Sequence, residues 1–237
     1  MEIYELTQST KPCSYLENEK ALFRYFYIKQ CNVFFYEELL QRGWRRFGNY
    51  FFVPICSNCD ACISIRQDCE KFIFSQSQKR ILKRKITFCV QKPTLSQRHL
   101  ELYNQYHRIM NQKKGWEYFE ISLDAYYDTF VQGHQEFGYE FDYYIDGVLA
   151  GVALVDILPQ SISAVYCYYD HAFAKYSLGS YSILKQIQIA KEYNIKYLYP
   201  GYWIKNHYSM GYKEHFRPFE ILVNRPSLED KPLWVKE

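Results

Sequence analysis

Three cysteines in a short loop are the residues of this sequence best suited to chemistry. Cys56, Cys59 and Cys62 form a C-x2-C-x2-C array within ICSNCDACISIR, and Arg66 follows four residues after the last of them. Thiolates at this spacing are typical of metal ligands and of redox-active pairs. A tightly turned loop can equally act as a scaffold that positions the arginine, so the spacing alone leaves all three interpretations open.

Composition narrows the class of protein that carries this loop. A chain of 237 residues with 48% hydrophobic content buries a core without help from disulfide bonds or metals. Its N-terminus lacks the basic start and apolar run of a signal peptide, so we expect a cytoplasmic protein with reduced thiols. The longest apolar stretch, Gly147 to Val155, is too short to cross a bilayer, so we expect no membrane partner.

One segment of the chain carries charge of a single sign. The net charge of the whole chain is only +3, but residues 71–100 contain no Asp or Glu. The basic residues of this segment are Lys71, Lys79, Arg80, Lys83, Arg84, Lys85, Lys92 and Arg98. Such a surface is typical of a binding site for a polyanion such as RNA, and it is equally typical of a solvated helix face.

The predicted elements divide the chain into two parts. In the first part, residues 35–43 favour a helix that ends at Gly43, and residues 44–55 favour a hairpin that holds the cysteine loop. Local patterns then predict helices at 95–110 and 122–132, strands on either side of the Asp146-Gly147 turn and at 161–170, a helix at 177–194 and a strand at 195–204. We therefore predict an α+β fold.

Several blocks of the sequence, taken in order, resemble a known family. They are CSYL at Cys13, LLQRGWRRFGNYFFVPICSNCDACISIR from Leu39, SQSQKR ending at Arg80, VDILPQSISAVYCYYD from Val155, SLGS at Ser177 and YLYPGYWIKNHYSMGYK from Tyr197. Together they resemble the bacterial aspartate/glutamate leucyltransferases, relatives of the eukaryotic arginyl-tRNA–protein transferases. His171, Pro200 and Ser209 depart from the family pattern, and none of these departures lies in the cysteine block.

The resemblance implies a fold and an activity. It implies a GNAT-like (acetyltransferase-like) C-terminal domain over residues 96–237 and a smaller N-terminal domain over residues 1–95, which contains the Cys-rich loop. The implied reaction transfers leucine from leucyl-tRNA to the α-amine of proteins that begin with Asp or Glu, which marks them for degradation in the N-degron (N-end rule) pathway. Arginyl transfer from arginyl-tRNA is the main alternative. A coenzyme A-dependent N-acetyltransferase and a non-catalytic, zinc-bearing RNA-binding module are further alternatives.

The chemistry of this reaction requires no cofactor. An aminoacyl ester is already activated, so the enzyme mainly has to position the amine, remove a proton and stabilise the oxyanion. We expect Asp156, at the end of an apolar strand, to be the catalytic residue that orients the ammonium and passes its proton to water. The alternative for Asp156 is a structural role, capping the turn before Pro159.

Substrate recognition requires cations and surfaces for stacking. The acceptor carboxylate needs a cation, for which Arg66 is the first candidate and Lys79 and Arg80 are the next, each with a structural salt bridge as the alternative. The residues expected to bind the tRNA or its aminoacyl end are Lys83, Arg84 and Lys85, the helix start at Gly179 and Ser180, and the aromatic residues Tyr168, Tyr202 and Trp203. Strand aromatics are also typical of a core. The helix start lacks the glycine-rich loop with which GNAT enzymes bind coenzyme A.

A fourth cysteine completes a set of metal ligands. Cys13 together with Cys56, Cys59 and Cys62 would supply four thiolates, enough for tetrahedral zinc or for an iron–sulfur cluster. The alternative is a metal-free thiol loop that sets Arg66 at the acceptor pocket. The remaining cysteines, Cys31, Cys69, Cys89 and Cys167, are expected to be small core residues.

Overall fold

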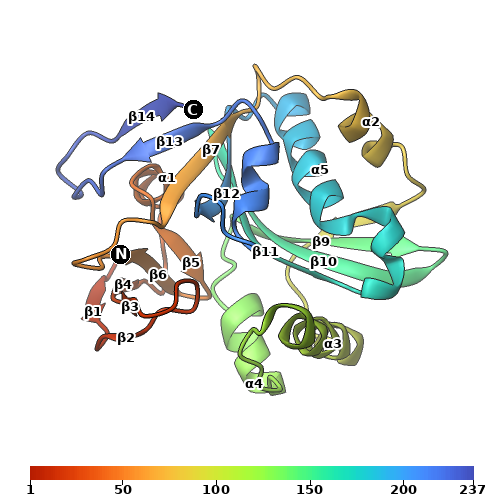
Figure 1. Cartoon of the computed structure of the whole chain (residues 1–237), viewed down its shortest axis with the longest axis horizontal. Helices are drawn as coiled ribbons and strands as arrows, with labels where there is room; N and C mark the ends of the chain where they lie inside the picture. The colour runs from red at the N-terminus through yellow and green to blue at the C-terminus, as the bar shows by residue number, and fades with distance from the viewer.

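An eight-stranded mixed sheet forms the centre of the computed structural model, which describes residues 1–237 (Figure 1). Its strand order is β14–β13–β7–β12–β11–β10–β9–β8, and only the neighbours β11 and β12 run parallel. The bounds are β7 Ile63–Asp68, β8 Thr87–Gln91, β9 Gly138–Ile145, β10 Val148–Ile157, β11 Ser161–Tyr169, β12 Tyr197–Trp203, β13 Glu220–Val223 and β14 Leu233–Lys236. The predicted α+β fold is confirmed in its combination of sheet and helices, but the sheet is larger than the predicted strands suggest.

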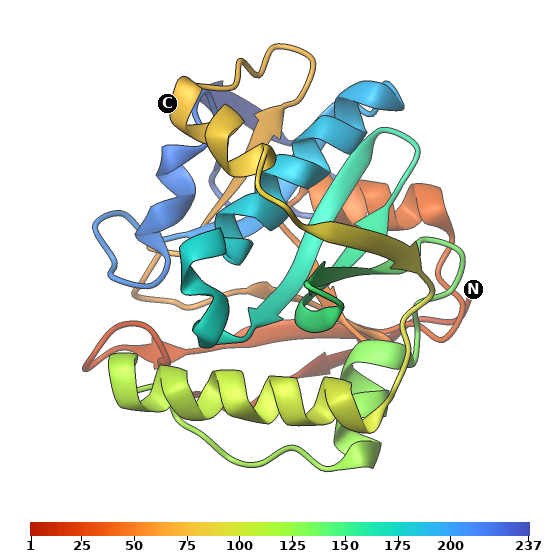
Figure 2. The same ribbon diagram turned by 90° about the vertical axis from the view of Figure 1, so that its right-hand side faces the viewer.

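Helices cover both faces of this sheet (Figure 2). One face packs against α5 (Leu178–Glu192), with α2 (Gln76–Leu82) beside it, and the other packs against α3 (Gln97–Lys114) and α4 (Leu123–Tyr126). Side chains alternate along a strand, so Ala153 and Val155 of β10 face α5 whereas Val152 and Leu154 face α3. None of the helices combines the length and the hydropathy needed to cross a lipid bilayer.

A second, smaller sheet is formed by the N-terminal part of the chain. Its order is β1–β4–β6–β5, with β1 Tyr4–Thr7, β4 Phe23–Tyr27, β6 Tyr50–Pro54 and β5 Arg45–Phe47. The predicted hairpin is therefore β5–β6, and the predicted helix is α1 (Val33–Gln41), which packs against this sheet. Two-residue strands β2 (Lys11–Pro12) and β3 (Lys20–Ala21) form a small separate ribbon.

Three short helices of other types complete the chain, a π-helix η1 (Tyr127–Val131) and 3-10 helices η2 (His171–Tyr176) and η3 (Gly211–His215). The turn of the β5–β6 hairpin packs tightly on η1. A Cβ atom at Gly48, whose φ is +53°, would lie 2.3 Å from the carbonyl oxygen of Asp128. Only glycine fits this turn, because its backbone conformation is left-handed and the backbone of η1 leaves no room for a side chain.

The two predicted domains do not separate at residue 95 in the fold. β7 and β8 come from the first 95 residues, yet both belong to the eight-stranded sheet. β7 pairs with β12 and β13, and β8 pairs with β9. Residue 95 is therefore not a structural boundary, because strand pairing joins segments that local sequence patterns cannot connect.

The parallel strands β11 and β12 form a fork. They pair only over residues 161–163 and 197–199, although β11 continues to Tyr169 and β12 to Trp203. Beyond the paired residues, β11 pairs only with β10 and β12 only with β7. Backbone groups on the inner edges of the two strands therefore need other partners.

Candidate functional site

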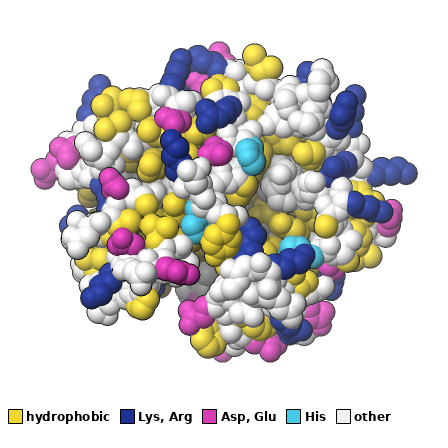
Figure 3. Space-filling model, viewed as in Figure 1, with side chains coloured by type: hydrophobic (Ala, Val, Ile, Leu, Met, Phe, Trp, Pro, Cys, Tyr) yellow, Lys and Arg dark blue, Asp and Glu magenta, His cyan; other side chains and the backbone are white.

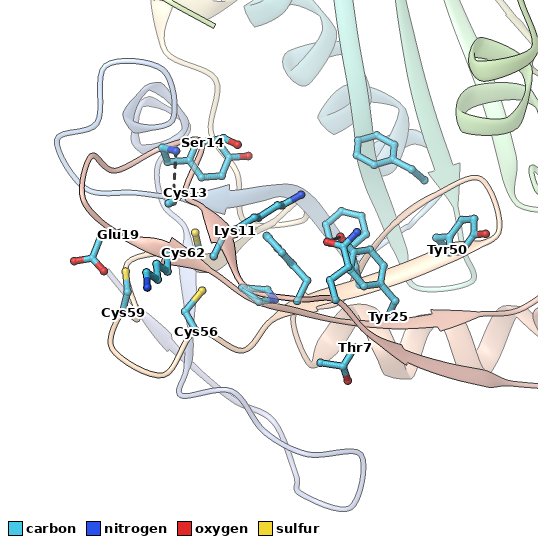
Figure 4. A pocket seen from close by; sticks show the side chains of 18 of the residues that line it. Thr7, Lys11, Cys13, Ser14, Glu19, Tyr25, Tyr50, Cys56, Cys59 and Cys62 are labelled. Atoms are coloured by element: carbon cyan, nitrogen blue, oxygen red, sulfur yellow. Dashed lines mark hydrogen bonds between the residues drawn. The ribbon is translucent and has the colours of Figure 1, made fainter. Parts of the chain in front are cut away.

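A pocket of about 650 Å³ lies against the N-terminal sheet and the cysteine loop (Figure 4). Apolar and aromatic side chains from β4, β5 and β6 line one part of it, including Phe23, Phe47 and Phe52. Charged side chains of both signs also line it, namely Lys11, Lys20, Arg225, Glu19 and Asp128. A ligand held in this pocket would meet apolar surface together with positive and negative groups.

All four predicted thiols line this pocket, and Figure 4 shows them together at one end of it. Cys13 therefore joins the array although 43 residues separate it from Cys56 in the chain. Arg225 holds the loop in place by donating hydrogen bonds to the carbonyl oxygens of Cys56 (3.2 Å) and Cys59 (2.8 Å). The backbone N–H of Leu22 donates to the sulfur atom of Cys56 at 3.4 Å.

The donor set of the loop suits a soft metal ion, but the sulfur atoms do not surround a single point. No three of the four sulfur atoms lie within 4.8 Å of one another. Burial, together with negative charge on Cys13, Cys56 and Cys59, raises the pKa of the Cys62 thiol to about 12. In the absence of a cation, Cys62 is therefore protonated at neutral pH.

The other cysteines fit the predicted core role only in part. Cys31 and Cys69 are buried, Cys167 is partly buried, and Cys89 is exposed. Cys89 lies on β8, an edge strand of the large sheet, where side chains of one face are not covered. The prediction for Cys89 is wrong for this reason.

Arg66 does not reach the pocket, which contradicts its predicted role in acceptor binding. Its side chain on β7 is only 9% exposed and lies over the rings of Tyr197 and Trp234, 3.7 and 4.3 Å from their centroids. Its Nε donates to Glu220 at 2.8 Å, and another guanidinium nitrogen donates to the hydroxyl of Tyr199 at 3.2 Å. Arg66 is therefore a structural residue, enclosed by aromatic rings and paired with a carboxylate.

Asp156 is fully buried, which contradicts its predicted catalytic role. Its carboxylate accepts a 2.8 Å hydrogen bond from Nε of Arg46, forms a second ion-pair contact with that guanidinium, and accepts a 2.7 Å hydrogen bond from the hydroxyl of Tyr36. Both oxygens are thus occupied by protein donors. The group does not cap the turn before Pro159 either; it joins β10 of the large sheet to β5 of the small one.

The aromatic residues predicted to stack on the tRNA end are also buried. Tyr168 is fully enclosed, and its hydroxyl hydrogen-bonds the hydroxyl of Tyr126. The Tyr202 hydroxyl donates to the carbonyl oxygen of Gly43 at 2.9 Å, and Trp203 packs within a small apolar cluster. These three predictions are wrong, because the strands that carry the residues are covered on both faces.

The predicted phosphate site at the start of α5 stays a prediction that the geometry allows. Gly179 and Ser180 lie in the first turn of α5 and are partly exposed. The N-cap residue Ser177 has a φ of +49° and makes no side-chain hydrogen bond to the turn. Backbone N–H groups of this turn therefore remain free for an anion.

The basic residues predicted to bind tRNA lie on the surface over α2, outside the pocket. Lys79, Arg80, Lys83 and Lys85 are exposed and Arg84 is partly buried. Figure 3 shows dark blue side chains along the right-hand edge of this face, on the side of α2. None of these residues lines the pocket. A role for Lys79 or Arg80 in acceptor binding at the pocket is thus not supported, and contact with tRNA stays a prediction.

Two basic residues that the sequence did not single out occupy the β11–β12 fork. The Arg45 guanidinium donates to the carbonyl oxygen of Ala164 on β11 at 2.6 Å and to that of Tyr199 on β12 at 3.2 Å. Lys213 donates from its amine to the carbonyl oxygen of Tyr202 on β12. Both side chains thus satisfy groups that the divergence of the strands leaves unpaired. The sequence shows only that these two residues are basic, and no local pattern in it reveals that they are buried.

The pKa of the Lys213 amine is far below that of an ordinary lysine. Burial and the neighbouring Arg45 guanidinium lower the pKa of its amine to about 7, with Cys62 acting weakly in the opposite direction. Cys62 also lines the pocket, so the fork and the pocket are within electrostatic range of each other.

Comparisons of the sequence with family models and with known proteins point to one family of transferases. Family models for the N terminus and the C terminus of arginine-tRNA-protein transferase match residues 11–80 and 98–223. The chain is 55% identical to a Helicobacter hepaticus protein named aspartate/glutamate leucyltransferase, over 99% of this chain and 98% of that protein. It is 43% identical to a Campylobacter jejuni protein of the same name, over 94% of this chain and 95% of that protein.

Among solved structures, the chain resembles the crystal structure of FemX. The TM-score is 0.51 at 9% sequence identity, and the match covers 83% of this chain and 68% of FemX. At this identity the likeness shows the fold alone, and this fold agrees with the GNAT-like architecture expected for the C-terminal part of the chain.

Proposed function

This chain belongs to the arginine-tRNA-protein transferase family, and we propose that, like its relatives named aspartate/glutamate leucyltransferase, it transfers leucine from leucyl-tRNA to proteins that begin with Asp or Glu. Its substrates are an aminoacyl-tRNA and a protein acceptor. The reaction forms a peptide bond at the acceptor α-amine and breaks the ester bond to the tRNA. The product begins with leucine and enters the N-degron pathway of degradation, and we propose that the enzyme acts in the cytoplasm.

The charge pattern of the pocket carries the assignment of the acceptor site. A protein that begins with Asp or Glu presents an ammonium group and a carboxylate within one residue. The pocket offers cations for the carboxylate in Lys11, Lys20 and Arg225, and carboxylates for the ammonium in Glu19 and Asp128. A pocket of about 650 Å³ also has room for more than the first residue of the acceptor.

Arg225 is the strongest candidate for the carboxylate contact. It is partly buried, and two of its N–H groups are fixed on the carbonyl oxygens of Cys56 and Cys59. A guanidinium has five N–H groups, so three remain to bind a planar carboxylate. Because the loop holds the guanidinium in place, little side-chain entropy is lost on binding. This arrangement gives Arg225 the role that the sequence had suggested for Arg66.

The transfer step does not need a buried base. An α-amine has an ordinary pKa of about 7.7–8.0, so a useful fraction is already neutral near pH 7. Glu19 is partly exposed at the pocket and can accept a hydrogen bond from the ammonium and pass the proton to water. The reaction then proceeds by positioning and by electrostatic stabilisation of the oxyanion.

The aminoacyl end of the tRNA is assigned to the fork side of the pocket. Arg45 places a permanent positive charge between β11 and β12, and the first turn of α5 offers free N–H groups to a phosphate. Exposed Lys79, Arg80 and Lys83 over α2 would contact the tRNA backbone at a distance from the chemistry.

The transfer requires no cofactor, and the thiol loop has a structural role in this proposal. The four cysteines fit zinc or an iron–sulfur cluster by donor type. Such a group would close the loop and hold the carbonyl oxygens that position Arg225. No step of the transfer passes through it.

A reconstituted transfer assay tests the function. Purified protein is mixed with leucyl-tRNA or arginyl-tRNA, each labelled on the amino acid, and with peptides that begin with Asp, Glu, Asn or Gln. We expect label from leucyl-tRNA on the Asp and Glu peptides only. Label from arginyl-tRNA alone would establish arginyl transfer instead, and acetylation of the peptides by acetyl-coenzyme A without tRNA would reject the transferase assignment.

A further inference from the structure

A separate cluster of polar side chains is buried where α3 begins. His99 in the first turn of α3 faces Glu140 and Asp142, which are two residues apart on β9 and therefore lie on the same face of the sheet. Figure 2 shows α3 running beneath the large sheet, directly after β8. His99 is 6% exposed and the two acidic residues are 0% exposed. None of the three lines the pocket.

The charge of this cluster is not balanced by the protein. No lysine or arginine forms an ion pair with either carboxylate, and His99 is their sole ionic contact. The other donors are neutral. Glu140 accepts from the amide of Gln91 at 3.1 Å and from the hydroxyl and the backbone N–H of Thr94 at 2.9 and 3.4 Å, and Asp142 accepts from the amide of Gln91 at 2.9 Å and the hydroxyl of Tyr144 at 3.3 Å. Even with a protonated histidine, two buried carboxylates leave a net charge of −1. Buried charge of this kind is strongly unfavourable unless a cation compensates it.

The geometry of the cluster matches a coordination shell better than a set of hydrogen bonds. Nε2 of His99 lies 3.3 Å from Oε1 of Glu140 and 3.6 Å from Oδ1 of Asp142. Charge-assisted N–H···O bonds are shorter, about 2.7–2.9 Å. Nε2 and Oδ1 are both buried without a hydrogen-bond partner. Ligand atoms about 2.0–2.1 Å from a tetrahedral zinc ion lie about 3.3 Å apart.

The far side of the imidazole ring is oriented as in many metal sites. Nδ1 of His99 lies 2.6 Å from the hydroxyl oxygen of Ser96, the N-cap residue of α3. A partner on the second ring nitrogen fixes the ring and directs Nε2 toward the carboxylates. Three ligand atoms within 4.8 Å of one another then face a common point.

We propose that His99, Glu140 and Asp142 bind one Zn²⁺ ion that fixes the start of α3 to β9. An imidazole with two carboxylates is a suitable ligand set for zinc, and the ion neutralises both buried charges. The same helix carries His107, whose Nε2 lies 2.7 Å from the hydroxyl of Tyr166 on β11. The ion therefore stabilises the helix that packs beside the β11–β12 fork.

The rival interpretation is a protonated histidine shared between the two carboxylates. Burial disfavours the charge on His99, but the nearby carboxylates of Asp142 and Glu140 outweigh it and raise the pKa of the imidazole to about 9. In that case the imidazolium compensates one of the two carboxylates, and the cluster binds no metal. The two interpretations differ in metal content and in the response of stability to added Zn²⁺.

The test uses the full-length, reduced protein with Cys59→Ser, so that the thiol loop cannot dominate metal binding. After a chelator has removed bound metal, we expect this variant to rebind one equivalent of Zn²⁺ and to melt at a higher temperature when Zn²⁺ is added. Co²⁺ in place of Zn²⁺ should give weak visible bands without the strong near-ultraviolet absorption of thiolate ligands. The wild type should bind the same equivalent in addition to any ion held by the thiols.

Further variants in the same background locate the ion. His99→Gln and Asp142→Asn should lose the equivalent. Ser96→Ala should weaken Zn²⁺ affinity about 10–100-fold, because it removes the group that orients the imidazole. Ser75→Ala removes the N-cap of α2, which contacts no ligand of the site, and should leave affinity unchanged. A folded Cys59→Ser protein without Zn²⁺ binding and without a thermal shift overturns the proposal, as does full binding in both ligand variants.

Discussion

Replacing Asp156 by asparagine separates a structural role from a catalytic one. In the fold, Asp156 is 0% exposed and holds the buried guanidinium of Arg46 through two contacts, one of them a 2.8 Å hydrogen bond. The neutral amide keeps one acceptor oxygen but leaves the guanidinium charge uncompensated. Breaking a buried ion pair in this way costs about 3–5 kcal/mol, a large share of the roughly 5–15 kcal/mol by which a domain is stable.

The measurement is urea unfolding at 25 °C, together with transfer activity per folded molecule at a lower temperature. We expect Asp156→Asn to lose about 3–5 kcal/mol in the free energy of unfolding while the folded fraction keeps its kcat. Asp146→Asn is the matched control, because Asp146 lies exposed in the β9–β10 turn with a φ of +48°, a conformation that asparagine also adopts. Its unfolding free energy should change by less than about 0.5 kcal/mol.

A double variant adds a stricter condition. Arg46→Met with Asp156→Leu replaces the pair by apolar side chains, and such replacements are often neutral or stabilising. We therefore expect the double variant to recover much of the stability that Asp156→Asn loses. An Asp156→Asn protein of native stability with a collapsed kcat would refute this reasoning and restore the catalytic assignment.

Three further predictions concern the pocket, the fork and the tRNA surface. Arg225→Ala should lower kcat/KM for Asp-starting peptides by the equivalent of about 1.5–3 kcal/mol in transition-state free energy and weaken the preference for Asp over Asn. Arg217→Ala, which changes an exposed arginine outside the pocket, should alter neither quantity. An unchanged preference in Arg225→Ala would remove this residue from the acceptor site. The Lys213 amine has a pKa of about 7 in the folded protein against 10.5 in the unfolded chain, so the unfolded state binds more protons between pH 7 and pH 10.5 and stability should rise with pH across this range. Lys213→Met should reduce this slope by up to about 1.4 kcal/mol per pH unit. Equal slopes in the wild type and the variant would contradict the lowered pKa. Neutralising Lys83 and Lys85 should raise KM for leucyl-tRNA and reduce its salt dependence while KM for the peptide stays constant, and tRNA kinetics that match the wild type at low and high salt would exclude contact.

The elements that were predicted correctly depend on local signals. The Asp146-Gly147 turn, the β5–β6 hairpin and the buried stripe of α5 each follow from residues close together in the chain. Turn chemistry and hydrophobic periodicity act over a few residues, so one sequence is sufficient to detect them. The grouping of Cys13 with the cysteine loop was different, because it followed from the need of a tetrahedral site for a fourth thiolate and not from a local pattern.

The site residues that were predicted wrongly depend on contacts between distant segments. Asp156 meets Arg46 across 110 residues, and Arg66 meets Glu220 across 154 residues. Whether such a charge faces solvent, a substrate or a buried partner is decided by strand pairing, which local patterns do not reveal. The same reason explains why Arg45 and Lys213 were missed, since their burial in the fork follows from the divergence of β11 and β12.

Strand β5 connects the parts of the proposed active site. Its three residues are consecutive, and each contacts a different feature: Arg45 bridges the two strands of the fork, Arg46 pairs with Asp156 in the large sheet, and Phe47 lines the pocket. Neighbouring residues of a strand point to opposite sides, so β5, an edge strand of the small sheet, is fixed to the large sheet by contacts from both of its faces. The proposed donor side and the acceptor pocket are therefore fixed relative to each other by one short strand and a buried ion pair. Because a misplacement of about 1 Å can cost a transferase 100-fold in rate, a rigid connection of this kind is what the positioning of an amine against an ester requires.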